Sequence, residues 1–190
     1  MDARELAYGL FRVLETGDPN LAADVVAPDN HNREASVSPT ACGIPGPAGT
    51  LASGAWMRSA FSDLRFPITE VVDGGDRVWV RLRMQGRQTG PFVRFRDGAL
   101  DQAIPPTGRE IDFEQVHMLT IRDGKVAGHE ALRDDITMLG QLGVFPPAPA
   151  IMLRMVAWKV SGRAARAAAE VTALAAEAAG KLAGAAPTSR

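Results

Sequence analysis

Residues 110–143 carry the pattern that most constrains how this chain can fold. Two runs of alternating apolar side chains flank the segment 122–125, Arg-Asp-Gly-Lys, and Asp-Gly between two such runs is a strong signal for a β-hairpin. Alternate side chains of a strand share a face, and one face of the first run carries Ile111, Phe113, Gln115, His117, Leu119 and Ile121. Burying Gln115 and His117 without hydrogen-bond partners costs roughly 1–3 kcal/mol each. The hairpin therefore predicts one wall of a pocket.

Composition narrows the class of protein. The 190 residues are 46% hydrophobic and 23% charged, enough for one domain with a core and an extension. A formal charge of -1 gives no general attraction to nucleic acid or to an anionic membrane. Cys42 is the single cysteine, which excludes an internal disulfide and a Cys/His zinc site. Without a signal-peptide pattern, a membrane-spanning run or a nucleotide-binding fingerprint, the expectation is a cytoplasmic protein with no cofactor and no metal.

Two helices are expected at the N-terminus. Apolar side chains recur at helical spacing over residues 3–15, and Gly17 ends this first helix. Asp18-Pro19 is an N-cap followed by proline at the first helical position, which predicts a second short helix through Val26.

The next segment predicts a short strand, a loop and a third helix. Residues 31–37 are expected to form a strand that places Asn32 and Glu34 on one face. Residues 38–54 are rich in Gly, Pro, Ala and Thr, which is typical of a loop, and a helix is expected to begin near Pro47. The buried side of that helix is expected to include Trp56, Ala60 and Phe61.

A second hairpin is predicted over residues 68–86, with its turn at 73–76, Asp-Gly-Gly-Asp. Its inner face is expected to carry Val78, Val80, Leu82 and Met84, and its outer face Trp79, Arg81 and Arg83. Residues 90–108 contain several glycines, prolines and charges, and are interpreted as a long, partly ordered loop.

The C-terminal part changes in composition. Asp134 is expected to cap a helix over residues 136–142, after which alanine becomes dominant. Alanine favours helix but buries little surface, so this tail is helical only where it packs. We expect an α+β domain over residues 1–149, in which N-terminal helices and a curved antiparallel sheet enclose a conical cavity. Residues 150–190 are expected to form an alanine-rich helical extension, in part disordered.

The sequence from about Glu5 to Pro147 resembles the SnoaL-like polyketide cyclases, which are ester cyclases of the nuclear-transport-factor-two-like superfamily with its cystatin-like fold. The most specific match is IPPTGREIDFEQVHMLTIRDGKVAGHEALRDD, followed by MLGQLG. Earlier matches are APDNHN, Gly46-Pro47 and AWMRSAF, whereas residues 92–101 look like an insertion. Beyond about residue 149 the resemblance stops.

The resemblance implies a role in antibiotic biosynthesis, a part of secondary metabolism. Members of this family close rings on polyketide esters by intramolecular aldol condensation, with neither metal nor organic cofactor, in a hydrophobic pocket. Asn32, Gln115 and His117 fall on positions that resemble the family's cavity residues. Ala131 is a departure, because typical cyclases have the catalytic aspartate two residues after the histidine matched by His129. By analogy with the superfamily, a homodimer through the outer sheet face is expected.

Candidate site residues follow from this comparison and from chemistry. Histidine suits proton removal near neutral pH, so His129 and His117 are the candidate catalytic residues. The candidate substrate-binding residues are Asn32, Gln115, Trp56, Phe61, Phe113 and Ala131. Asn32 can instead serve a turn, and the aromatic residues can be core. Glu34 is expected to be a solvated strand-edge residue, and Glu130 to point to the opposite face of the sheet.

Three functions are open at this point. The leading hypothesis is a cofactor-independent polyketide cyclase-like enzyme that folds a hydrophobic polyketide and promotes ring closure. The second is a related pocket enzyme with other chemistry, such as a hydratase, an isomerase or a cyclase that acts by positioning alone. The third is a non-catalytic accessory protein that binds a small ligand. Neither nucleic acid nor membrane is expected as a partner.

Overall fold

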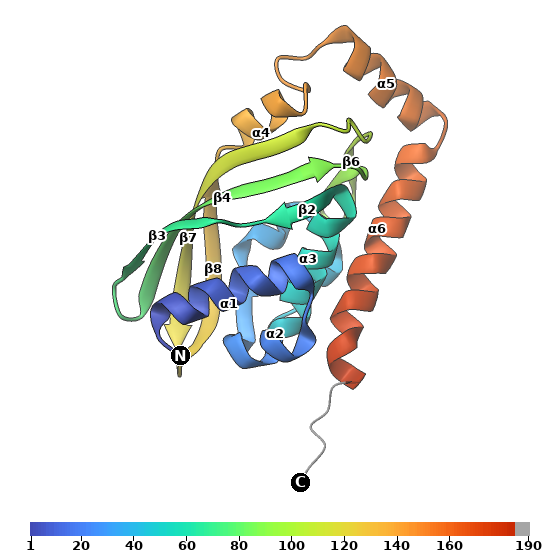
Figure 1. Ribbon diagram of the computed structural model, residues 1–190. Coiled ribbons are helices and arrows are strands. Elements are labelled where there is room, and N and C mark those ends of the chain that lie inside the picture. The colour runs from blue at the N-terminus through green and yellow to red at the C-terminus, as the bar shows by residue number, and fades with distance from the viewer. Residues whose placement is uncertain (185–190) are drawn as a thin grey trace.

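A curved six-stranded sheet forms one wall of the molecule in the computed structural model, which describes residues 1–184 (Figure 1). Its strands are β1 (Val26–Asn32), β2 (Phe61–Arg65), β3 (Ile68–Asp73), β4 (Arg77–Gln88), β7 (Glu110–Arg122) and β8 (Lys125–Arg133). They run in the order β1-β8-β7-β4-β2, and β3 also pairs with β4. β1 is parallel to β8, and the other pairs are antiparallel.

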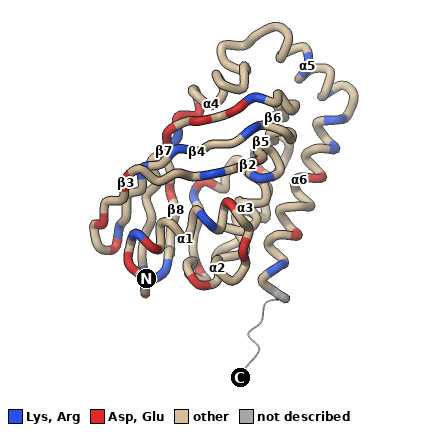
Figure 2. The backbone as a smooth tube through the Cα atoms, viewed as in Figure 1, with Lys and Arg blue, Asp and Glu red and all other residues tan. Residues whose placement is uncertain are grey.

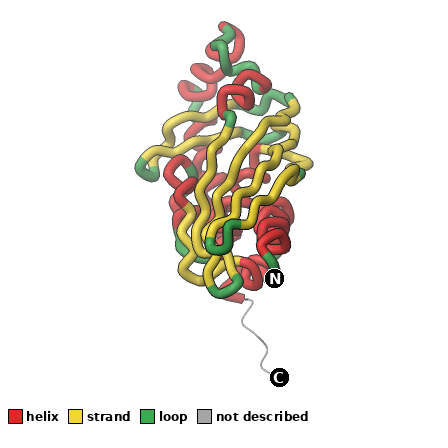
Figure 3. Tube along the Cα trace, turned by 90° about the vertical axis from the view of Figure 1, so that its left-hand side faces the viewer, coloured by secondary structure: helices red, strands yellow, loops and turns green. Residues whose placement is uncertain are grey.

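Helices cover the inner face of this sheet. Those from the N-terminal part are α1 (Ala3–Thr16), α2 (Pro19–Val25) and α3 (Pro47–Ala60), and the sheet curves around them (Figures 1 and 3). The C-terminal helices are α4 (Asp135–Gln141), α5 (Pro149–Val160) and α6 (Arg163–Gly180). Short 3₁₀ helices are η1 (Arg33–Val37), η2 (Thr40–Gly43) and η3 (Lys181–Gly184). The predicted α+β class is confirmed.

The first two helices begin and end where the sequence places the signals. Asp2 and Glu5 form a capping box, in which each side chain accepts a hydrogen bond of 2.8 Å from the other residue's backbone N–H. Gly17 ends α1 with a φ of 72°, a left-handed conformation that favours glycine. Asp18 then accepts two backbone N–H groups of α2 ahead of Pro19.

The two predicted hairpins of the main sheet are confirmed. Asp123 and Gly124 join β7 to β8, and both have positive φ values, as a two-residue turn of this kind requires. β4 pairs with β7 without interruption along its length, and the predicted inner face of β4 is buried: Val78, Val80, Leu82 and Met84. Charged residues of both signs mark these strands in Figure 2, and outer-face ion pairs join Arg81 to Glu114 and Arg83 to Asp112.

The strand predicted over residues 31–37 is wrong. The strand β1 ends at Asn32, and residues 33–37 form η1, which the Asn32 side chain caps by accepting the Glu34 N–H at 3.1 Å. Proline within a strand is compatible with β1 because β1 lies at the edge of the sheet, where Pro28 disrupts no ladder on its outer side.

The loop predicted over residues 90–108 is also wrong. It contains a separate two-stranded sheet made by β5 (Phe92–Arg96) and β6 (Ala99–Ile104). Asp97 and Gly98 form its turn with φ values of 52° and 76°, the same Asp-Gly chemistry that joins β7 to β8. The expectation that Phe61 belongs to the third helix is wrong, because α3 ends at Ala60 and Phe61 begins β2, a strand that follows α3 without a loop.

The alanine-rich segment is helical where it packs. α6 contacts α3 and runs beside it (Figure 1). Its buried side chains are Ala164, Ala167, Ala168, Val171, Ala175 and Ala178. The domain boundary after residue 149 and the partial disorder expected within residues 150–190 stay predictions, and residues 185–190 of that segment lie outside the described residues. Within residues 1–184, no helix is long and apolar enough to cross a membrane.

Candidate active site

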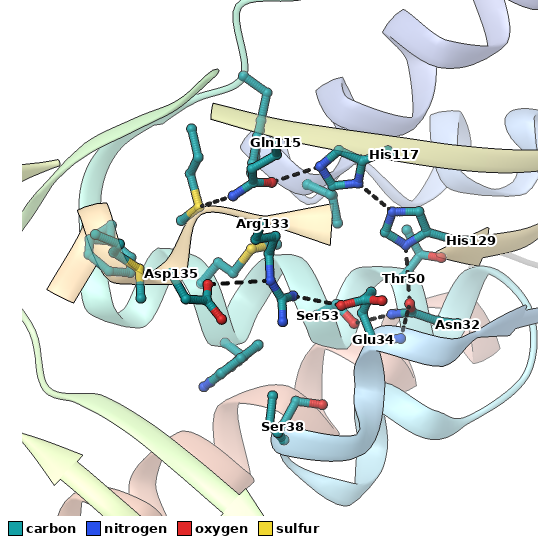
Figure 4. Close-up of a pocket in the computed structure, with 18 of the residues that line it drawn as sticks. Asn32, Glu34, Ser38, Thr50, Ser53, Gln115, His117, His129, Arg133 and Asp135 are labelled. Carbon is teal, nitrogen blue, oxygen red and sulfur yellow. Dashed lines mark hydrogen bonds and ion pairs between the residues drawn. The ribbon is translucent and has the colours of Figure 1, made fainter. Parts of the chain in front are cut away.

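A cavity lies between the inner face of the sheet, α3, η1 and α4 (Figure 4). Aromatic side chains form a large part of its wall: Trp56, Phe61, Phe66, Phe92 and Phe113. The Trp56 indole stacks on Phe92 at a ring-centroid distance of 5.8 Å, and its N–H donates to the Val93 carbonyl oxygen at 2.9 Å. The hairpin β5–β6 thereby helps to close the cavity, which the sequence analysis did not predict.

A chain of polar side chains runs along one side of the cavity (Figure 4). Gln115 Oε1 lies 2.7 Å from His117 Nε2, and His117 Nδ1 lies 2.7 Å from His129 Nε2. His129 Nδ1 lies 3.1 Å from Asn32 Oδ1, and the Asn32 amide donates to Ser53 Oγ at 3.4 Å. The chain therefore connects β7, β8, β1 and α3. It supplies the partners that the buried pair Gln115 and His117 requires.

The strand register explains why these side chains meet. Leu119 pairs with His129 and His117 pairs with Ala131, so His117 and His129 are diagonal neighbours on the inner face. Their rings are nearly parallel, at 4°, with centroids 5.0 Å apart. Phe11 of α1 packs against His117 at 76°, an edge-on contact that holds the ring in place.

The hydrogen-bonding partners constrain the protons on the two imidazoles. The Asn32 side-chain atom that accepts the Glu34 N–H is the amide oxygen, which cannot donate a hydrogen bond. His129 Nδ1, 3.1 Å from the same oxygen, therefore carries a proton and donates to it. If both rings are neutral, His129 Nε2 accepts from His117, and the NH₂ group of Gln115 must turn towards His117. With the Gln115 carbonyl oxygen towards His117, as in Figure 4, the pair accommodates one additional proton. Rotation of the Gln115 amide therefore lets the hydrogen-bond chain fit either the neutral or the protonated histidine pair.

Burial keeps the histidines neutral at ordinary pH. Burial and then the charge of Arg133 lower the pKa of His129 to about 4. Burial, followed by the positive charges of His129 and Arg133, holds the pKa of His117 well below its usual value.

A carboxylate stands beside this chain. Glu34 Oε1 accepts the Ala131 backbone N–H at 2.9 Å, and Glu34 Oε2 pairs with Arg133 Nη1 at 3.0 Å. Arg133 Nε also lies 3.6 Å from an Asp135 carboxylate oxygen. The Glu34 side chain is only 20% exposed and lines the cavity, so its prediction as a solvated strand-edge residue is wrong. The reason is η1, which turns Glu34 towards the sheet.

The structure brings together most of the residues singled out from sequence. The cavity-lining members are Asn32, Gln115, His117, His129, Trp56, Phe61 and Phe113. Ala131 lies beside the cavity, between His129 and Arg133 on β8, and contributes its backbone N–H rather than a lining side chain. Glu130 pairs with Arg33 at 3.2 Å, away from the cavity. The roles of all these residues stay predictions.

Several further residues line the cavity that were not predicted from the sequence, among them Asn30, Arg94 and Arg133. Arg133 shares the strand parity of His129, which is a usable signal. Asn30 and Arg94 lie on strands whose limits the sequence did not reveal. The Asn30 side chain is 3% exposed, and its Oδ1 has no hydrogen-bond partner in the described part of the chain. Among residues 1–184, no three His, Cys, Asp or Glu side chains are grouped so that they would hold a metal ion.

Comparison with protein families gives one match that covers most of the chain. Residues 5–142 match the model described as SnoaL-like polyketide cyclase. Aklanonic acid methyl ester cyclase DnrD of Streptomyces peucetius is 31% identical over 105 residues, covering 55% of this chain and 66% of that protein. Nogalonic acid methyl ester cyclase of Streptomyces nogalater is 34% identical over 89 residues, covering 46% and 60%. The matches thus span less than two thirds of these relatives.

Solved structures share the fold. TsrD from Streptomyces laurentii has a TM-score of 0.61 and 24% identity, covering 76% of this chain and 99% of that chain. IdmH from Streptomyces antibioticus has a TM-score of 0.56 and 27% identity, covering 76% and 100%.

The buried histidines predict a stability that falls in mild acid. Between the folded pKa of His129, about 4, and the ordinary value near 6.5, the unfolded chain binds more protons than the folded chain. The free energy of unfolding should therefore fall by roughly 1–2 kcal/mol for this residue from pH 7 to pH 5. Urea unfolding at both pH values measures the loss.

The control is the exposed His31. His31→Gln should keep the pH dependence of the wild type, whereas His129→Gln should reduce it. Equal pH dependence in the two variants would contradict the prediction.

Proposed function

Because the chain belongs to the SnoaL-like polyketide cyclase family, we propose that it closes a ring on a polyketide ester held in this cavity. The proposal rests on the arrangement of the cavity lining, which is apolar on one side and polar on the other. Aromatic side chains form much of it, and groups able to exchange protons, His129 and Glu34, gather on one side. An extended apolar substrate would fold against the aromatic side with its carbonyl groups towards the polar side.

Aldol ring closure makes specific demands on that polar side. A proton leaves a carbon between two carbonyl groups, the enolate attacks a second carbonyl carbon, and the new alkoxide takes up a proton. No proton is consumed overall, so a group that accepts the first proton can return it. His129 is the base predicted from sequence, and its low pKa means that it begins uncharged. Asn32 and the Gln115 carbonyl oxygen would stabilise the protonated histidine pair from its two ends.

Two further groups are suited to hold the substrate. Asn30 Oδ1 lacks a donor within the described residues, and a ligand hydroxyl would supply one. Arg94 lines the cavity from β5, where its guanidinium can donate to a carbonyl or carboxylate oxygen. The curated relatives are named for methyl esters of aklanonic acid and nogalonic acid, and we propose a polyketide methyl ester as the substrate here.

The alanine at position 131 favours a second candidate function. It stands where the resemblance places the catalytic aspartate, and a methyl group transfers no proton. A pocket that only positions or only binds a polyketide would fit this substitution.

Purified protein should convert aklanonic acid methyl ester or nogalonic acid methyl ester to a cyclised product. His129→Ala should lower kcat by about 10²–10⁴-fold, because it interrupts the hydrogen-bond chain that links His117 to Asn32 and removes a group able to exchange a proton. Product formation is followed by chromatography and mass spectrometry. His31→Ala, which removes a histidine outside the cavity, is the matched control. Saturable binding of both esters without product would assign the accessory, ligand-binding role instead.

Asn30 and Asn32 allow a comparison of the same substitution two residues apart. Asn30→Leu should raise the free energy of unfolding by about 1 kcal/mol, because it removes a buried acceptor without a donor, and it should raise KM. Asn32→Leu should instead destabilise the fold, because Asn32 takes part in three hydrogen bonds. Thermal unfolding and steady-state kinetics measure both. A destabilised Asn30→Leu protein with unchanged KM would contradict this role.

We also propose a homodimer through the outer sheet face, in a cytoplasmic protein. Apolar residues are exposed there in cross-strand pairs: Val72 with Trp79, and Val116 with Leu132. Analytical ultracentrifugation should give the mass of two chains, and Trp79→Asp should shift it towards one. A single-chain mass for the wild type at 100 μM, a concentration on the order of that used for weak dimers, would refute the dimer.

A further inference from the structure

The carboxylate of Glu34 lies against Ala131, the position at which the resemblance to the family implies a catalytic aspartate. Glu34 Oε1 accepts the Ala131 backbone N–H at 2.9 Å. The nitrogen and the Cβ of a residue are bonded to the same Cα, so the Glu34 carboxylate lies next to the point from which an aspartate side chain at 131 would extend.

The local fold holds Glu34 in this position. Asn32 caps η1 and accepts the Glu34 N–H, while His129 hydrogen-bonds to the same Asn32 oxygen. Arg133, two residues beyond Ala131 on β8, pairs with the other Glu34 oxygen at 3.0 Å. Figure 4 shows Glu34 between Arg133 and Asn32.

Proton-accepting capacity remains on Glu34 but not on His129. Both His129 ring nitrogens already have partners, Nε2 at His117 and Nδ1 at Asn32. A carboxylate has about four lone-pair sites, and the contacts with Ala131 and Arg133 account for two of those on Glu34. Direct proton transfer with a substrate therefore requires no rearrangement at Glu34, whereas at His129 it requires breaking a hydrogen bond.

We propose that Glu34 is the catalytic carboxylate of this enzyme, supplied by η1 in place of an aspartate at position 131, and that His129 is a positioning residue. The assignment rests on the proposed ring closure. Glu34 takes the proton from the carbon between two carbonyl groups, and the C–H electron pair becomes the enolate. The enolate forms the new C–C bond as the attacked C=O π pair moves to oxygen. The resulting alkoxide takes the proton back from the Glu34 carboxylic acid, so charge and protons balance.

The test moves the carboxylate between the two positions. With the ester that the wild type converts, Glu34→Gln should lower kcat at least ~100-fold with little change in KM. The double variant Glu34→Gln/Ala131→Asp should recover at least ~10-fold of that loss. Glu130→Gln, next to Ala131 but paired with Arg33, should behave as the wild type.

The unfolding temperature of each variant shows whether a lower kcat results from lost stability or from a lost catalytic group. If Glu34→Gln fails to fold, Glu34→Asp keeps the charge but withdraws it by one methylene, and should lower kcat in a folded protein. Wild-type kcat in a folded Glu34→Gln protein would overturn the assignment and return the base role to His129. A loss confined to KM, or a folded double variant without recovery, would also overturn it. If the wild type converts neither ester, the proposed function fails and this assignment fails with it.

Discussion

The need to satisfy two buried polar side chains on an apolar sheet face determines the arrangement of the whole site. Gln115 and His117 are both less than 5% exposed, and each loses its contacts with water on folding. Their partners come from β8, β1 and α3 in one continuous chain. Because the hydrogen-bond chain passes through Asn32, which also caps η1, the same requirement fixes the 3₁₀ helix that presents Glu34. The hydrogen bonds that satisfy Gln115 and His117 are therefore the same ones that form the polar wall of the cavity.

Local signals account for the part of the structure that could be predicted. The Asp123-Gly124 turn, the capping box at Asp2 and the alternation along β4 each depend on neighbours within a few residues. A strand's parity also predicts which side chains share a face, which is why the sequence positions of Gln115 and His117 were enough to indicate a pocket. The helix over the alanine-rich segment could be stated only conditionally, since its stability depends on packing against α3.

The rest depended on contacts between distant segments. Whether Pro28 lies in a strand depends on that strand being at the edge, which is a property of the whole sheet. Because β1 ends at Asn32 and η1 follows, Glu34 lies against β8 and not at a solvated edge, and its contacts with Ala131 and Arg133 join segments about 100 residues apart that no local pattern connects. The hairpin at Asp97-Gly98 had a usable local signal, but the surrounding charges and prolines obscured it.

The hairpin β5–β6 pairs with no strand of the six-stranded sheet, yet it brings Phe92 and Arg94 to the cavity. The part of the cavity lining that β5 supplies and the hydrogen-bond chain on β7 and β8 therefore belong to separate sheets. Selection can alter the hairpin in length or sequence while the chain on β7 and β8 stays intact. The shape of the cavity can in this way change at β5–β6 while the polar side chains on β7 and β8 keep their hydrogen bonds.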